Sequence, residues 1–196
     1  MTCQSVRLFL LRVSIHIDKM LTRLMIKGME YMANKREALE SLFKKTIMQA
    51  NEEEMEVLED LLKSLQRKQN GLHRTYIASM LGIKSRLLDD GTYESIIPIK
   101  PIAQNTLNII HGGITSTLID TAMGSLVNQH LPVNKAAVTL DMKINFLSKG
   151  IGTFIRCNAE IVHKEESRWV TRADVYRNDE KLIATATGNF FVVDRT

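Results

Sequence analysis

Residues 105–128 read NTLNIIHGGITSTLIDTAMGSLVN, and this stretch decides the fold. From residue 112 onward its apolar side chains recur every three or four positions, which is the spacing of an α-helix. These side chains cover most of the helix surface, so we expect this helix to be buried. They are Ile114, Leu118, Ile119, Ala122, Met123, Leu126 and Val127.

The segments on either side of this helix alternate between apolar and polar residues, which is typical of strands. Before it, residues 82–88 and 92–100 flank a hairpin turn at Asp89-Asp90-Gly91. After it, four strands are expected, centred on residues 138–146, 155–161, 169–175 and 182–193. In the first of these, Val138 and Leu140 are expected to face the same side as Met142. One helix cannot cover parallel crossovers, so we expect an α+β fold with an antiparallel sheet wrapped around that helix.

Residues 34–70 carry a helical pattern before the first strand. Asn34 with Glu37 and Asn51 with Glu54 each resemble a capping box at a helix start. The segment is therefore predicted to form two helices or one bent helix, ending near Gly71, with a short helix at 72–80. Two interpretations remain open: a helical hairpin packed on the main domain or its symmetry mate, or an arm that binds a partner or regulates activity.

The first 31 residues hold most of the positive charge of the chain. Five basic against two acidic residues give this segment +3 of the formal net charge of +4. The apolar run Leu8–Leu11 is too short to span a membrane. One hypothesis is that translation starts at Met32, so three segments are expected: a basic segment at 1–31, a helical extension at 32–71 and the main domain at 72–196.

Composition narrows the class of protein. Apolar residues make up 44% of the chain, as in an ordinary globular protein. Cys3 and Cys157 are too few for a disulfide framework, so we expect free thiols and a cytoplasmic location. No cysteine or histidine group has metal-ligand spacing, and we expect no metal, no cofactor, no nucleic-acid partner and no membrane partner.

The triplet His111-Gly112-Gly113 lies where a loop becomes the buried helix. The first N–H groups of a helix have no partners within it and point outward at the positive end of the helix dipole. Glycine lets a ligand carbonyl approach this backbone closely. The triplet is therefore a candidate oxyanion hole.

Asp120 lies about two turns into the same apolar helix, where a carboxylate is costly to bury. Gly113, Thr117, Asp120 and Gly124 follow at helical spacing and form a small, polar face. Spacing alone leaves two roles open for Asp120, a general base or nucleophile on one hand and a structural acid bonded to a loop on the other.

Together these motifs resemble the PaaI-type hotdog thioesterases, in which His-Gly-Gly precedes an aspartate nine residues on. His111 and Asp120 keep that spacing, and Asn105 matches an asparagine that the family often has six residues before the histidine. The stretches VTLDMKINFL at 138–147 and ATATGNF at 184–190 are also similar to the family. The resemblance covers about residues 72–194, with Asn108 standing where many members have glycine.

The resemblance implies an acyl-CoA thioesterase whose active site lies at a homodimer interface, in a dimer or a dimer of dimers. It implies that Gly112 polarises the thioester carbonyl, with Asn105 near the carbonyl or the water, and that Asp120 of the other subunit is the base or nucleophile. Thr139 would hold the water or the acid, and His111 would orient the loop or transfer a proton. Gly113 and Thr117 would contact substrate, and two basic residues, Lys149 and Arg168, could meet the CoA phosphates.

Other classes of protein fit less well. A lipase would need a Gly-x-Ser-x-Gly elbow, which the sequence lacks. The remaining alternative is a non-catalytic hotdog regulator that binds acyl-CoA, although the acidic run Glu52–Glu54 and its neighbours leave no basic recognition helix. The sequence does not disclose the acyl group.

Overall fold

The N-terminal part of the chain is one long helix. The computed structural model describes residues 3–195, with residues 3–23 described by their backbone alone. The chain divides into two compact units, Met1–Met55 and Glu56–Thr196. Helix α1 spans Cys3–Gln49 without a break, so the helix start expected at Asn34 is wrong. Asn34 is followed by Lys35 and Arg36, which are good helix formers, and nothing before it interrupts the backbone.

The second expected helix start is confirmed. Asn51 accepts the Glu54 N–H at 2.9 Å, and its own N–H donates to the Glu54 carboxylate at 2.9 Å, so α2 (Glu52–Gln69) begins with a complete capping box. Helix α2 is joined to the rest of the second unit by Asp60, which pairs with Lys100 at 2.6 Å. It is also held by Ser79 of α3 (Tyr76–Leu81), whose hydroxyl donates to the Ser64 carbonyl at 2.5 Å.

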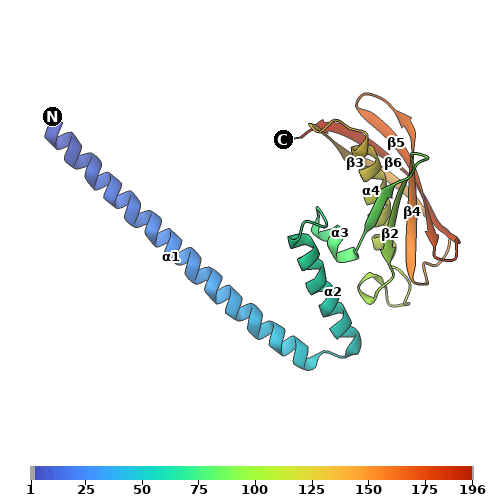
Figure 1. Ribbon diagram of the computed structural model, residues 1–196, viewed down its shortest axis with the longest axis horizontal. Coiled ribbons are helices and arrows are strands. Elements are labelled where there is room, and N and C mark those ends of the chain that lie inside the picture. Colours follow the sequence, from blue (N-terminus) through green and yellow to red (C-terminus); the bar gives the residue numbers. More distant parts are fainter. Residues whose placement is uncertain (1–2, 196) are drawn as a thin grey trace. The chain divides into compact units, whose positions relative to one another are not determined.

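The six strands found in residues 3–195 form one antiparallel sheet, as the alternating pattern predicts (Figure 1). Its order is β1-β2-β4-β5-β6-β3, so the hairpin strands lie at one edge and β3 at the other. The strands are β1 (Lys84–Leu87), β2 (Tyr93–Pro98), β3 (Lys135–Phe146), β4 (Phe154–Lys164), β5 (Arg168–Arg177) and β6 (Leu182–Asp194).

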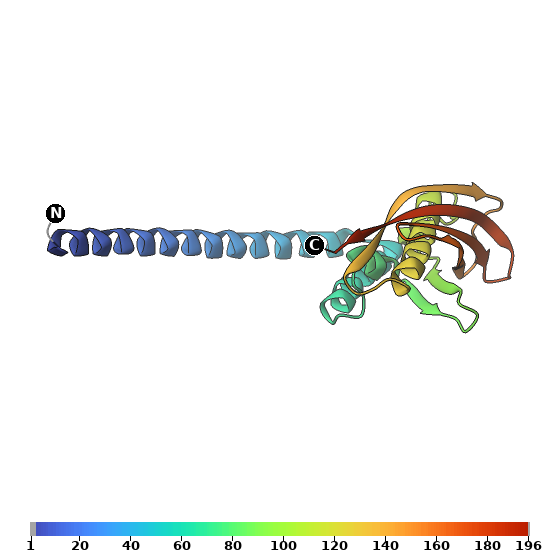
Figure 2. The ribbon, with the colours of Figure 1, turned by 90° about the horizontal axis from the view of Figure 1, so that it is seen from above.

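Helix α4 (Gly112–Gln129) lies in the curve of this sheet, and its apolar stripe forms the centre of the core (Figure 2). Leu118, Ile119, Ala122, Met123 and Leu126 are all fully buried, which confirms the expected buried helix. A short 3-10 helix, η1 (Pro101–Ala103), leads from β2 toward the loop before α4. None of the helices in residues 3–195 is both long and apolar enough to cross a bilayer.

A β-bulge interrupts the edge strand β3 at Leu140. Thr139 pairs with Phe190 and Asp141 pairs with Asn189, so Leu140 has no partner on β6. The extra residue reverses the alternation, and Thr139 takes the side that Phe190 and the helix occupy. Val138 and Leu140 are therefore 45% and 50% exposed, and the expectation that they share the inner face with Met142 is wrong.

Candidate active site

The loop before α4 is a tight turn that ends at the helix start. Asn105 accepts the Leu107 N–H through Oδ1 at 2.9 Å, and the Asn108 N–H donates to the Asn105 carbonyl at 2.9 Å. Asn108 has a φ of 54°, in the left-handed region that asparagine tolerates better than most residues. Glycine adopts this backbone conformation at least as readily as asparagine.

The exit of this loop is fixed by bonds to two other segments. The Ile110 N–H donates to the Gly150 carbonyl and the His111 N–H to the Ala103 carbonyl, each at 2.9 Å. Gly150 allows this approach because a Cβ there would lie 2.2 Å from a methyl carbon of Ile110. The first turn of α4 is thus anchored on both sides.

His111 is the N-cap of α4. Its Nδ1 accepts the Gly113 N–H at 2.9 Å, and its carbonyl accepts the Ile114 and Thr115 N–H groups. Within residues 3–195, the Gly112 N–H is then the one group of the first turn with no acceptor. This amide is the atom that the sequence singles out as an oxyanion donor, and the ring of His111 serves the neighbouring amide instead.

Gly112 opens into a cleft of about 400 Å³ that Asn105, Phe146 and Lys149 also line. Phe146 lies against Gly112, with its ring carbon 3.4 Å from where a Cβ would be. The Asn105 Oδ1 accepts the Leu107 N–H, and the Nδ2 has no acceptor among the described residues, so it can donate to a ligand. The cleft thus brings together two donors and one cation of the predicted set.

Asp120 and Thr139 form a second group. The Thr139 hydroxyl donates to Asp120 Oδ1 at 2.7 Å, and the bulge at Leu140 is what turns Thr139 toward the helix. Asp120 is half-buried and lies at the side of the sheet that the edge strand β3 closes. Because the Thr139 hydroxyl bonds to only one oxygen of the Asp120 carboxylate, the other oxygen is available to a water or a substrate.

One chain does not bring the two groups together. Asp120 lies eight positions after Gly112, which corresponds to about 12 Å along a helix. A base has to lie within about 3 Å of the proton it takes, directly or through one water. Asp120 does not line the cleft beside Gly112, so neither group is a complete site by itself.

The other predicted site residues lie in less informative places. The Thr117 hydroxyl donates to the Gly113 carbonyl at 2.9 Å, within the helix. The space beside Gly124 is filled by Phe190, whose ring carbon is 3.3 Å from where a Cβ would be. Arg168 is exposed at the start of β5 and is not part of the cleft that Lys149 lines.

Two features of the site carry no clear signal in the sequence. The bulge at Leu140 lacks the glycine that often marks such a residue. Phe146 reads as an ordinary inward strand residue, although it forms the wall opposite the Gly112 amide. Cys157 offers no competing nucleophile, because burial raises the pKa of its thiol far above the ordinary value.

An antiparallel sheet wrapped around one central helix, with a glycine amide exposed at the start of that helix, defines a hotdog-fold protein. A model of the thioesterase superfamily matches residues 107–184. A presumed esterase from Halobacterium salinarum is 32% identical over 127 residues, which cover 59% of this chain and 83% of that protein. The chain belongs to the thioesterase superfamily, and it is a thioester hydrolase.

Two further relatives extend the comparison. A Bacillus halodurans protein whose crystal structure contains CoA is 41% identical, with a TM-score of 0.73 over 78% of this chain and 99% of that one. A match over 78% of this chain is longer than residues 72–196 and therefore reaches into the preceding helices. A medium/long-chain acyl-CoA thioesterase from Salmonella typhimurium is 22% identical. The match covers 43% of this chain and 63% of that enzyme, which is less than two thirds of the enzyme's length.

Proposed function

We propose that this protein is a PaaI-type acyl-CoA thioesterase whose active site is shared between two copies of the chain. The observation that carries the proposal is the separation of the two groups: an exposed donor at Gly112 and an oriented carboxylate at Asp120 lie on one helix but too far apart to act on one carbonyl. A second copy that places its Asp120 opposite the first copy's Gly112 would complete the site.

The edge strand β3 supports pairing with a second copy. It has 12 residues, and no other strand of the described chain pairs with its outer side. Unpaired backbone groups on a long edge are a template for another strand. The exposed apolar side chains of Val138 and Leu140 lie on this strand, and Phe146 and Leu147, each 55% exposed, lie at its end. Burying these side chains in a homodimer would add a hydrophobic contribution to the strand pairing.

The acyl-CoA assignment is supported by two relatives. One was crystallised with CoA, and the other is a medium/long-chain acyl-CoA thioesterase. In the cleft of this chain, Lys149 offers a cation beside the Gly112 amide. The acyl chain itself is to be determined with a panel of acyl-CoA substrates.

The reaction that this geometry supports needs few groups. The thioester oxygen would accept from the Gly112 N–H and the Asn105 Nδ2, which stabilise the negative charge that develops on it. Asp120 of the second copy would take a proton from a water as that water forms the new C–O bond. The C–S bond then breaks and CoA leaves as a thiolate, which is a good leaving group and accepts the proton in turn.

A covalent route uses the same atoms. Asp120 could instead attack the carbonyl directly and expel the thiolate, forming an anhydride that water then hydrolyses. In either route the Thr139 hydroxyl would hold Asp120 in one rotamer through its 2.7 Å bond. After a single turnover in labelled water, ¹⁸O enters the Asp120 carboxylate only if the anhydride forms and water attacks its aspartyl carbonyl, so label found there identifies the covalent route.

The direct test is Asp120→Asn, which keeps the shape of the side chain and removes its basicity. We expect kcat for acyl-CoA hydrolysis, followed by thiol release, to fall by about 10³-fold, within the range that a lost general base costs. The matched control is Asp141→Asn on the same strand as Thr139, since its amide can still accept from Asn189. Unchanged kcat in Asp120→Asn would overturn the assignment, and tight acyl-CoA binding without turnover by the wild type would favour the non-catalytic regulator.

A further inference from the structure

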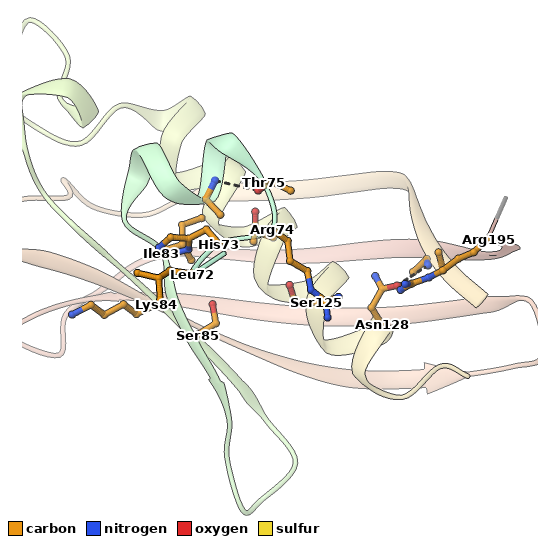
Figure 3. A pocket seen from close by; sticks show the side chains of 14 residues that line it. Leu72, His73, Arg74, Thr75, Ile83, Lys84, Ser85, Ser125, Asn128 and Arg195 are labelled. Carbon is orange, nitrogen blue, oxygen red and sulfur yellow. Dashed lines mark hydrogen bonds between the residues drawn. The ribbon is translucent and has the colours of Figure 1, made fainter. Parts of the chain in front are cut away.

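A second cleft lies at the other end of α4 from Gly112 (Figure 3). It has a volume of about 760 Å³ and lies between the segment leading into α3, β1, the last turns of α4 and the first residues of β3. A smaller cleft of about 520 Å³ adjoins it and shares four lining residues, Arg74, Ser125, Asn128 and Arg195. Neither shares a residue with the cleft beside Gly112.

The lysine and arginine side chains that line this cleft give it a positive charge. Arg74, Lys84 and Arg195 line it, and no aspartate or glutamate does so among the residues described. The adjoining cleft is likewise lined by the two arginines and by no acid of the described chain. A concave surface with one sign of charge concentrates counter-ions, so this space attracts anions.

No acidic side chain among the described residues forms an ion pair with the cations of this cleft, Arg74, Lys84 and Arg195. Arg195 donates through Nε to the Lys135 carbonyl at 2.8 Å, which fixes the side chain and leaves the other guanidinium nitrogens to a ligand. Arg74 points toward Ser125 from the α3 side, and Arg195 reaches the region of Asn128 from the other side (Figure 3).

A structural role at the end of α4 does not account for these arginines. Basic side chains near a helix C-terminus often bond to its last carbonyls. Here the Leu126 carbonyl is bonded to the His130 ring at 2.9 Å, and the Val127 and Asn128 carbonyls accept the His130 and Leu131 N–H groups. These three carbonyls are therefore satisfied without either guanidinium.

We propose that this cleft binds a phosphate-bearing ligand, with Arg74 and Arg195 as opposed phosphate-binding groups and Lys84 as a third cation. A guanidinium presents paired N–H donors that match two phosphate oxygens, and a lysine adds a point charge. The hydroxyl of Ser125, which lines both clefts from α4, can donate to the same group.

Two kinds of ligand could place a phosphate group in this cleft. Thr121, which lines it, follows the proposed catalytic acid Asp120 directly in the chain, although Asp120 itself does not line the cleft. The phosphates of an acyl-CoA substrate could occupy it, an inference that rests on the proposed function. A separate phosphorylated molecule could equally occupy it and act as an effector. The same cationic groups would bind either ligand.

The binding experiment titrates the full-length chain at low ionic strength with pyrophosphate and with adenosine 3′,5′-bisphosphate, in a calorimeter. We expect both to bind the wild type, and Arg74→Ala and Arg195→Ala each to weaken binding about tenfold, as loss of a charge-assisted bond does. Arg74→Lys keeps the charge without the paired donors and should lose less. The control Lys181→Ala removes the same charge from the exposed β5–β6 turn and should bind as the wild type does.

A kinetic experiment identifies which of the two ligands occupies the cleft. Acyl-CoA and the matching acyl-N-acetylcysteamine thioester carry the same reactive bond, but only the first has phosphates. If CoA occupies the cleft, Arg74→Ala raises KM for acyl-CoA about tenfold and leaves the short thioester unchanged. If a separate ligand occupies it, Arg74→Ala leaves KM for acyl-CoA unchanged and still weakens pyrophosphate binding. Both results support the site.

The proposal is overturned if neither phosphate compound binds the folded wild type, or if both arginine variants bind as it does. Equal weakening in Lys181→Ala would also overturn it, because the effect would then be one of net charge. Circular dichroism confirms that each variant is folded. The titration requires no turnover, so a failure of thioester hydrolysis leaves its result intact and is recognised separately.

Discussion

The two halves of the proposed active site differ in which part of the chain supplies the reactive group: the backbone in one half and a side chain in the other. At the start of α4 the donor is a backbone amide, set free because His111 and its carbonyl satisfy the neighbouring N–H groups. In the middle of α4 the reactive group is a side chain, held by one hydroxyl from a bulged edge strand. The first half rests on a backbone amide that the side chains of Asn105 and His111 support, whereas the second rests on one carboxylate that a single substitution removes.

The largest effect expected from this comparison is rescue of activity between two inactive chains. Asn105→Asp keeps the oxygen that accepts the Leu107 N–H and removes the donor, so it should lower kcat by about 10²-fold or more. Asp120→Asn disables the other half. In a mixed dimer one site combines an intact loop from one chain with an intact acid from the other, so random mixing should restore about a quarter of wild-type activity.

The measurement is thiol release after the two inactive variants are mixed, dissociated with mild denaturant and refolded together. Each variant refolded alone is the control. A site contained within one chain would give no recovery, since every chain then carries a defect. That result would exclude the shared site while leaving the family assignment untouched.

A second prediction concerns the hydroxyl that holds the acid. Thr139→Val removes the 2.7 Å bond to Asp120 at nearly constant volume, and we expect kcat to fall about tenfold because Asp120 samples other rotamers. Thr139→Ser retains the donor and should keep most of the activity. The control Thr187→Val changes an exposed threonine on β6 and should leave kcat unchanged. Equal kcat values for the valine variant and the wild type would remove Thr139 from the mechanism.

The fold could be predicted from the sequence because the spacing of apolar residues within each segment determines whether it forms a helix or a strand. The stripe from Ile114 to Val127 predicted a buried helix at 112–128, and α4 spans Gly112–Gln129. The turn signals and alternating residues placed all six strands. The start expected at Asn34 failed because a capping box needs a break in the preceding helix, and α1 has none there.

The geometry of the site was harder to predict, because it depends on long-range register. Residues 138–146 alternate in a way that places Val138 and Leu140 inside, and only pairing with β6 reveals the bulge that turns Thr139 inward instead. The cleft of Arg74 and Arg195 joins residues far apart in the chain. Asn105 and Gly112, in contrast, come together through a local turn, which the motif spacing anticipates.

The substitutions with the smallest expected effect test whether His111 transfers a proton in the reaction or only stabilises the start of α4. His111→Ala removes the acceptor of the Gly113 N–H and should cost about 0.5–2 kcal/mol of stability, measured by urea unfolding. His111→Asn can accept the same N–H from the N-cap position, so it should recover most of that stability and most of the activity lost by the alanine variant. If His111 transferred a proton, the asparagine variant would be as inactive as the alanine variant. Recovery therefore assigns His111 to the backbone half of the site, where it leaves the Gly112 N–H as the group that faces the substrate.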